Sequence, residues 1–334
     1  MPAKVVARVG LDFTLAEKML TEAGAQLILA PLWTEKDIIQ YAGDADAVIV
    51  AASEPYTQKV IQNLGKCKII SRLGIGINNI DVEEATRQGI PVANVLDASV
   101  HEVSDHAMAF LLAFSRKIFP LAQAVRKGAW KAGSNEITKV RGQMFRLNQQ
   151  TLGVVGVGRI GARVAQKARA FGMRVLGYDP YLSSSELQQR GAEKVDFDPV
   201  LRDSDFISLH APLTPETRGM FGLKEFRAMK PTAVIINTAR GAIINEQALY
   251  QALVEGSIGG AGVDVCEPEP PLPDNPLFQL EQVLVTGHTA FFSETSMVEL
   301  QQKATEAAIA ALRGNWPPVL VNPEVKEQKN RRIQ

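Results

Sequence analysis

A glycine-rich turn near the middle of this 334-residue chain constrains its fold more than any other feature. The stretch from Leu152 to Gly161 reads LGVVGVGRIG, which predicts a buried strand, a tight turn and the start of a helix. Gly156 permits the turn, Gly158 lets a pyrophosphate come close to the backbone, and Gly161 lets the helix pack on the strand. Amide groups at the helix N-terminus attract phosphate. The pattern predicts a dinucleotide-binding unit, with residues 1–150 folded ahead of it as something else.

A second apolar run, Arg174–Tyr178, follows the predicted helix and ends in Asp179. A carboxylate at this spacing bonds the ribose hydroxyls and repels a 2′-phosphate, so we expect NAD rather than NADP. Arg174 precedes the strand, where it is poorly placed to bind such a phosphate. The alternative is a glycine turn without a ligand, but here both strands, the helix and the acid occur together.

The charge and cysteine content exclude several classes of function. Lys plus Arg and Asp plus Glu number 36 each, so no net field recruits nucleic acid or an anionic membrane. An anionic substrate must therefore be held by a local cation. Cys67 and Cys266 have neither metal-ligand spacing nor a disulfide framework, which predicts no metal site and fits a reducing cytoplasm. No apolar run approaches the ~18 residues of a membrane helix, and the first ten residues lack a secretory pattern.

The first hundred residues alternate short apolar runs with helix-like segments. Strands are predicted at Val5–Val9, Gln26–Leu29, Ala47–Val50, Lys68–Ile70 and Val92–Val95. Helical spacing covers Leu15–Ala23, Glu35–Tyr41, Thr57–Leu64 and Val82–Gln88. The alternation predicts a parallel sheet covered on both faces, in a small α/β domain without a nucleotide fingerprint.

The rest of the chain is expected to form a crossing helix, an arm and a second α/β unit. Dense apolar residues predict one long buried helix over His101–Phe119, whereas the polar stretch Ala132–Gln150 predicts an arm or long loop. The second unit is expected from Thr151 to His288, a final helix at Ser293–Leu312, and a frayed or disordered tail at 322–334. The later strands are predicted at Phe206–Leu209, Ala233–Ile236, Gly260–Val263 and Val283–Val285.

The four histidines are the first candidates for a proton donor, because hydride transfer from a nicotinamide to a carbonyl group requires an acid near the carbonyl oxygen. His101 and His106 lie five residues apart on the predicted helix, off a common face, and are interpreted as surface or domain-interface residues. His210 follows a predicted strand, where a structural or cofactor-edge role is favoured. His288 closes the last strand of the second unit, at the ligand-binding edge, and is the best candidate acid.

A cation and a supporting acid are also available after predicted strands. Arg240 lies just past the strand at 233–236, where its planar fork can bind a carboxylate, although a surface arginine there would be ordinary. Asp264, Glu267 and Glu269 lie in the proline-rich turn VDVCEPEPP. Taken alone, these acids indicate a solvated loop, but beside His288 one of them would stabilise an imidazolium.

Together these motifs resemble the D-isomer-specific 2-hydroxyacid dehydrogenases, a group with D-3-phosphoglycerate dehydrogenases, glyoxylate/hydroxypyruvate reductases and C-terminal-binding corepressors. The resemblance runs from SRLGIGINNID at residues 71–81, through residues 99–106 and the glycine fingerprint, to Phe292. It implies an α/β fold of two doubly wound parallel-sheet domains. A Rossmann NAD-binding domain (101–288) would be inserted into a flavodoxin-like substrate-binding domain (1–100 and 289–334).

The same resemblance implies an interdomain Arg–Glu–His active site, matched here by Arg240, Glu269 and His288, with Glu269 preferred over Glu267. Backbone amides of Ile75 and Gly76 are implied to receive the substrate carboxylate. Asp264 is implied to lie near the nicotinamide, with Pro212 and Thr217 near the adenosine. The full set implied to bind the cofactor is Gly156, Gly158, Arg159, Ile160, Gly161, Asp179, Pro212, Thr217, Thr238, Ala239 and Asp264.

Two positions depart from the pattern of the family. Gly287 stands where the family usually has the proline of a Thr-Pro-His motif, which loosens the approach to His288. Asn78 stands where the family has an acid before Asn79.

The expected activity is reversible, NAD-dependent reduction of a small 2-oxo acid to its D-2-hydroxy acid. Arg240 would bind the carboxylate, and His288, supported by Glu269, would act as general acid and base. The segment Val50–Pro55, expected to line the pocket, has no cation and adds an acid, which favours an unphosphorylated substrate; Arg72 is a candidate cation. The alternative is a nicotinamide-sensing, corepressor-like binding protein with little turnover.

A homodimer is implied by the resemblance, and the crossing helix with the arm at Ala132–Gln150 is the candidate interface.

Overall fold

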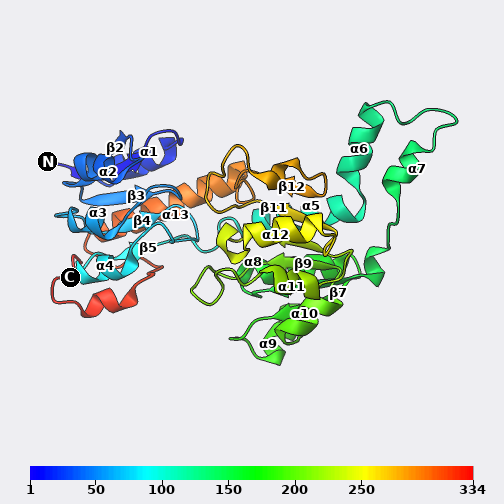
Figure 1. Ribbon diagram of the computed structural model, residues 1–334. Coiled ribbons are helices and arrows are strands. Elements are labelled where there is room, and N and C mark those ends of the chain that lie inside the picture. Colours follow the sequence, from blue (N-terminus) through cyan, green and yellow to red (C-terminus); the bar gives the residue numbers. More distant parts are fainter. Residues whose placement is uncertain (334) are drawn as a thin grey trace. The chain divides into compact units, whose positions relative to one another are not determined.

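The computed structural model describes residues 1–333, and the chain divides into two compact units (Figure 1). Unit 1 consists of Met1–Ser99 and Phe292–Gln334, and unit 2 consists of Val100–Phe291. The boundaries expected from the sequence lay close by, at 100/101 and 288/289. Unit 2 is thus inserted into the sequence of unit 1.

Unit 1 is built on a five-stranded parallel sheet of order β2-β1-β3-β4-β5. Its strands are β1 (Ala3–Arg8), β2 (Ala25–Ala30), β3 (Ala47–Val50), β4 (Ile70–Arg72) and β5 (Val92–Ala93). Its helices are α1 (Thr14–Glu22), α2 (Glu35–Ala42), α3 (Gln58–Gln62), α4 (Val82–Arg87) and α13 (Glu294–Leu312). This is the flavodoxin-like strand order, which reverses between β1 and β3.

Local sequence explains these elements. All four residues of β3, AVIV, are buried, as expected of a strand covered on both faces. Capping boxes begin α2 at Thr34 and α13 at Ser293, where each hydroxyl accepts a backbone N–H of the first turn. The predicted alternation is confirmed, although β4 begins at Ile70 rather than Lys68.

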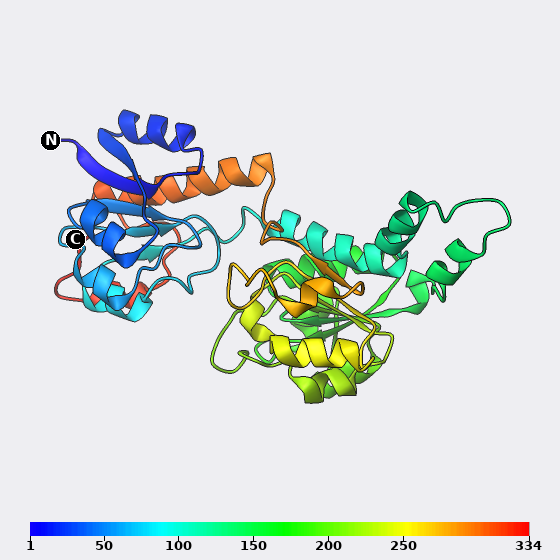
Figure 2. The ribbon, with the colours of Figure 1, turned by 45° about the horizontal axis from the view of Figure 1, so that its top comes forward.

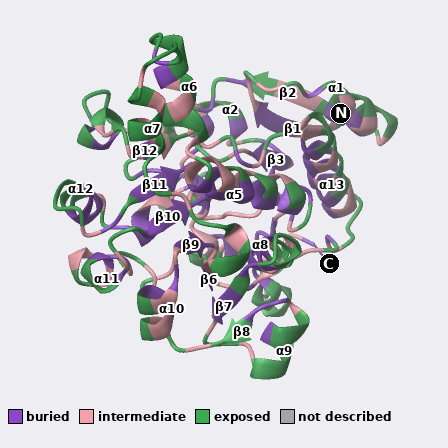
Figure 3. Cartoon of the chain, turned by 90° about the vertical axis from the view of Figure 1, so that its right-hand side faces the viewer, coloured by how far each residue is buried: buried purple, intermediate pink, exposed green. Residues whose placement is uncertain are grey.

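Unit 2 is built on a seven-stranded parallel sheet of order β12-β11-β10-β9-β6-β7-β8. Its strands are β6 (Thr151–Val155), β7 (Arg174–Tyr178), β8 (Glu193–Lys194), β9 (Phe206–Leu209), β10 (Val234–Asn237), β11 (Gly260–Val263) and β12 (Val283–Val285). Its helices are α5 (Val100–Ser115), α6 (Ile118–Arg126), α7 (Glu136–Arg141), α8 (Arg159–Ala170), α9 (Ser184–Gln189), α10 (Phe197–Asp203), α11 (Leu223–Ala228) and α12 (Glu246–Val254). The order is that of a Rossmann sheet, with the reversal between β6 and β9. Figure 3 shows the central strands buried and the outer surfaces of α9 and α10 exposed.

Helix α5 packs closely on the sheet because β11 contains glycine. A Cβ on Gly262 would lie 2.8 Å from the ring of Phe110, and one on Gly260 would lie 2.9 Å from Phe114. Both aromatic residues come from α5. The predicted single helix over His101–Phe119 is wrong in its length, because α5 ends at Ser115 and Lys117 is left-handed with φ of +49°.

Beyond this break, α6 and α7 project from unit 2 as an arm (Figures 1 and 2). The polar stretch that predicted an arm or loop contains the short helix α7. Across residues 1–333, no single helix is long and apolar enough to cross a membrane. The pair α5 and α6 satisfies that test jointly, by length and composition, with a bend of 60° between them.

The C-terminal tail is ordered through Ile333, which corrects the prediction of a frayed segment; Gln334 lies outside the described residues. The buried Asn322 side chain accepts the N–H of Val92 at 2.8 Å and donates to Thr86 and Ile90. These bonds satisfy backbone groups at the edge strand β5, so the tail completes the sheet of unit 1.

Candidate active site

The glycine turn of unit 2 joins β6 to α8 at the carboxyl edge of the sheet. Gly156 has φ of +83°, and a Cβ there would lie 2.6 Å from the backbone nitrogen of Ala211. A Cβ on Gly161 would lie 2.1 Å from the carbonyl oxygen of Gly156, so glycine is needed for this close packing. At Gly158 nothing lies within 4 Å of such an atom. The turn before Arg159 and Ile160 therefore leaves space for a ligand. The N-terminus of α8 begins there, and its backbone N–H groups favour an anion.

Asp179 lies beside this turn at the end of β7. Its two carboxylate oxygens accept the N–H of Val157 at 3.0 Å and that of Tyr181 at 3.1 Å. The residue is half-exposed, so the carboxylate can accept hydroxyl groups of a ligand as well. Arg174, at the start of β7, forms an ion pair with Glu193 at 2.8 Å. Its charge is therefore already paired away from the glycine turn.

Other residues of the same edge fit a dinucleotide. The Thr217 hydroxyl donates to the carbonyl of Pro212 at 2.7 Å, which fixes the loop after β9. Ala239 donates its N–H to the Asn237 side chain at 3.0 Å. Thr238 is buried, and its hydroxyl has no hydrogen-bond partner among residues 1–333. An orphaned buried hydroxyl at a ligand edge is the feature expected where a bound molecule completes the hydrogen bonding.

His210 also follows a strand, β9. Burial lowers the pKa of His210 to about 3, so the ring is neutral near pH 7. Its Nε2 atom makes a hydrogen bond with the Ser208 hydroxyl at 2.8 Å. These contacts fit the structural or cofactor-edge role expected for it.

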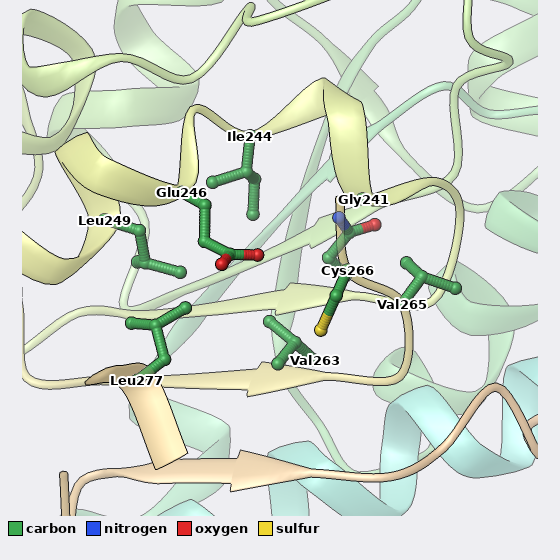
Figure 4. Close-up of a pocket in the computed structure, with 9 residues that line it drawn as sticks. Gly241, Ile244, Glu246, Leu249, Val263, Val265, Cys266 and Leu277 are labelled. Atoms are coloured by element: carbon green, nitrogen blue, oxygen red, sulfur yellow. The ribbon is translucent and has the colours of Figure 1, made fainter. Parts of the chain in front are cut away.

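Arg240 follows β10 and is brought near the proline-rich loop by its glycine neighbour. Asn237 donates to the Arg240 carbonyl at 2.8 Å, and Gly241 lies against the backbone of Cys266, where a Cβ would be 2.1 Å from the carbonyl carbon (Figure 4). Burial lowers the pKa of Arg240, whereas the charge of Glu269 acts in the opposite direction. The Glu269 carboxylate is therefore close enough for its negative charge to act on the Arg240 guanidinium.

The small pocket behind this contact is structural. Its lining is mostly apolar and includes the Glu246 carboxylate and the Cys266 thiol (Figure 4). Glu246 accepts the Asn275 side-chain amide at 2.5 Å. Burial raises the pKa of Cys266 to about 11, so its sulfur remains a thiol.

The structure brings Glu269 and His288 together. Oε1 of Glu269 and Nδ1 of His288 are hydrogen-bonded, with the two side chains 39% and 31% exposed. Glu267 instead lies 4.0 Å from Arg218. Pairing at Nδ1 leaves Nε2 of His288 as the ring nitrogen that can meet a reactant.

Asp264, the third acid of the proline-rich turn, fixes the segment that carries His288. It is 2% exposed, and its two oxygens accept the N–H groups of Thr289 at 2.9 Å and Ala290 at 3.0 Å. Its carbonyl accepts the N–H of His288 at 2.7 Å. His288 has φ of +53°, a conformation that a non-glycine residue adopts only when its surroundings hold it there.

Sequence reasoning missed His106 and Thr286 as neighbours of this turn. The His106 Nε2 atom lies 2.9 Å from the Thr286 hydroxyl, across 180 residues of sequence. The histidine side chain is 24% exposed, so it is half-buried beside the turn. No local pattern could have indicated this pair, because only the fold brings α5 beside the end of β12.

The remaining candidates lie in unit 1, after β4. The N–H groups of Ile75 and Gly76 have no acceptor among residues 1–333, while the Asn94 side chain donates to the Ile75 carbonyl at 2.8 Å. The described residues contain no group of three or more His, Cys, Asp or Glu side chains able to hold a metal.

The chain matches the family model described as D-isomer specific 2-hydroxyacid dehydrogenase, NAD binding domain, over residues 108–290. It is 40% identical to a glyoxylate reductase of Korarchaeum cryptofilum over 87% of each chain. It is 39% identical to a D-3-phosphoglycerate dehydrogenase of Methanocaldococcus jannaschii over 94% of this chain, but spans only 59% of that protein.

Among solved structures, a D-lactate dehydrogenase from Aquifex aeolicus complexed with NAD and lactic acid has a TM-score of 0.83 and 28% identity. That match covers 95% of this chain and 98% of the other. The chain therefore belongs to the D-isomer-specific 2-hydroxyacid dehydrogenase family, as an NAD-dependent oxidoreductase that reduces 2-oxo acids.

Proposed function

We propose that His288 is the general acid that protonates the carbonyl oxygen of the 2-oxo acid, and the base in the reverse direction. The observation that carries this proposal is the hydrogen bond between its Nδ1 and Glu269, which orients the ring and leaves Nε2 to the substrate. Arg240 binds the substrate carboxylate through its planar fork. The Ile75 and Gly76 amides, whose N–H groups have no acceptor among the described residues, are further proposed ligands of that carboxylate.

The bound nicotinamide supplies the hydride chemistry. The residues proposed to hold the dinucleotide are Gly156, Gly158, Arg159, Ile160, Gly161, Asp179, Pro212, Thr217, Thr238, Ala239 and Asp264. Gly158 offers open backbone to the phosphates, and the Thr238 hydroxyl offers an unused hydrogen-bonding group. Asp179 is proposed to bond the ribose hydroxyls.

The substrate proposed is a small unphosphorylated 2-oxo acid such as glyoxylate or hydroxypyruvate. The chain spans most of the length of the glyoxylate reductase relatives but about half of several D-3-phosphoglycerate dehydrogenases. In unit 1, Arg8 is paired with buried Glu54 at 2.8 Å, and Arg72 is buried against the Leu73 carbonyl. Neither arginine offers an uncompensated, exposed charge to a phosphate.

A reducing cytoplasm is the proposed compartment, because both cysteines are buried free thiols and one lies in each unit.

Replacing the general acid should abolish most turnover without preventing cofactor binding. We expect His288→Ala to lower kcat by about 10² to 10⁴, since general acid catalysis contributes that much. Steady-state kinetics and NADH fluorescence titration measure the two effects. His101→Ala, a change at an exposed histidine, is the matched control and should keep full activity. Unchanged turnover in His288→Ala would exclude this assignment.

A panel of 2-oxo acids with NADH tests the substrate class. We expect kcat/KM for glyoxylate or hydroxypyruvate to exceed that for phosphohydroxypyruvate by at least about ten-fold, the effect of one missing charged contact. A preference for phosphohydroxypyruvate would contradict the proposal. Tight NADH binding without turnover on any acid would instead favour the sensing role.

Cofactor choice tests Asp179. We expect kcat/KM to favour NADH over NADPH, because the carboxylate repels a 2′-phosphate. Asp179→Ser should shrink this ratio by removing the repulsion. A wild-type preference for NADPH would refute the role given to Asp179.

A homodimer through the arm of α6 and α7 is also proposed. The arm exposes Ile118, Phe119, Val125, Trp130 and Phe145, and Trp130 is 81% exposed. Helix α7 buries none of its residues, so a second copy of the chain would supply the cover that this apolar surface lacks. Sedimentation should show a dimer, and Trp130→Glu should weaken it. A wild-type monomer at micromolar concentration would contradict the proposal.

A further inference from the structure

A hydrogen-bonded chain links His106, on α5, to the turn that carries His288. The Nε2 atom of His106 lies 2.9 Å from the Thr286 hydroxyl, and that hydroxyl donates to Oδ1 of Asp264 at 2.5 Å. The same oxygen accepts the Thr289 N–H, and the other accepts the Ala290 N–H. Three donors thus converge on one buried carboxylate.

The direction of these bonds fixes what His106 must do. Each oxygen of Asp264 accepts hydrogen bonds, as an ionised carboxylate does. Because the Thr286 hydroxyl has a single proton and donates it to Asp264, the hydroxyl can only accept from His106. The Nε2 atom of His106 must therefore carry a hydrogen. The imidazole rests edge-on against Phe110, with ring centroids 4.8 Å apart, which holds Nε2 toward Thr286.

Packing at Gly287 does not hold the turn. A Cβ built at this residue would have no atom within 4 Å. His288 is in the left-handed region, and its N–H reaches both the Asp264 and the Thr286 carbonyls, at 2.7 and 3.0 Å. The position of His288 therefore depends on the residues that anchor Asp264 and Thr286.

We propose that His106 is a positioning residue for the proton transfer. By donating to the Thr286 hydroxyl, it fixes the direction of the Thr286–Asp264 bond, and Asp264 in turn holds the backbone of His288. This inference rests on the proposed role of His288 as general acid. It requires an N–H donor at residue 106, and it does not require a charge there.

Two substitutions at this position separate donation from packing. His106→Leu removes the donor, and we expect amide exchange in residues 286–290 to accelerate about ten-fold and kcat to fall by a similar factor. His106→Gln retains an N–H group without a titrating ring, and we expect both quantities to return close to the wild-type values. Hydrogen exchange by mass spectrometry and steady-state kinetics measure them, and the Kd for NADH should stay within about three-fold.

Two results would overturn the proposal. One is unchanged exchange in His106→Leu; the other is equal damage in His106→Gln, which would assign the effect to ring packing on Phe110. If the leucine variant does not fold, Thr286→Val and Thr286→Ser test the chain at its middle member, because valine removes the hydroxyl that joins His106 to Asp264 and serine keeps it; unchanged exchange in Thr286→Val would likewise overturn the proposal.

The exchange measurement also separates this inference from the proposed function. Faster exchange in His106→Leu, combined with full activity of His288→Ala, would leave the anchoring intact and refute the role of His288. Unchanged exchange, combined with an inactive His288→Ala, would refute the anchoring alone.

Discussion

The geometry of the candidate site depends on one buried carboxylate. Burying Asp264 costs much free energy unless its oxygens accept hydrogen bonds. His288 keeps its left-handed backbone only if neighbouring groups hold it in place. Each condition is met by the other segment: the turn at residues 286–290 supplies the donors, and Asp264 supplies the acceptors. Because β11 and β12 are adjacent parallel strands, the carboxylate and the turn arrive at the same edge of the sheet. Neither would be stable in this form alone.

The same edge gives two histidines opposite properties. His210 follows β9, where burial lowers its pKa to about 3 and leaves a neutral ring bonded to Ser208. His288 follows β12, where it remains partly exposed and contacts a carboxylate. The residue type and the place after a strand are alike, so the two histidines differ in their surroundings and not in their position on the sheet. The sequence could rank the histidines only by their place after a strand, whereas their hydrogen-bond partners tell them apart.

The sequence predicts features that depend on local backbone geometry. Glycine spacing predicts the turn at Gly156 because a left-handed residue and a close helix approach are needed within a few positions. Apolar runs predict most strands, since a doubly covered sheet buries both faces of each strand. The break after Ser115 was not predictable, because Lys117, a residue without left-handed preference, takes that conformation. The anchoring of Asn322 and of His106 depends on partners distant in sequence, which no periodicity reveals.

Charge is balanced locally as well as over the whole chain. Arg8 ends β1 and Glu54 follows β3, the neighbouring strands at which the order of the unit 1 sheet reverses and at which ligands of such sheets bind. Glu54 is 1% exposed, so without Arg8 its burial would be strongly unfavourable. The guanidinium of Arg8 also lies over the Trp33 ring, with its Cζ atom 4.1 Å from the ring centroid, and this contact further restrains it. The sequence predicted that the segment Val50–Pro55 adds an acid to the pocket. The structure shows that this acid, Glu54, is paired with Arg8.

A cation that is needed to keep a buried carboxylate stable cannot also serve an incoming phosphate with its full charge. Under the proposed function, Arg240 is the cation offered to the substrate, and a single cation suits a substrate with a single carboxylate.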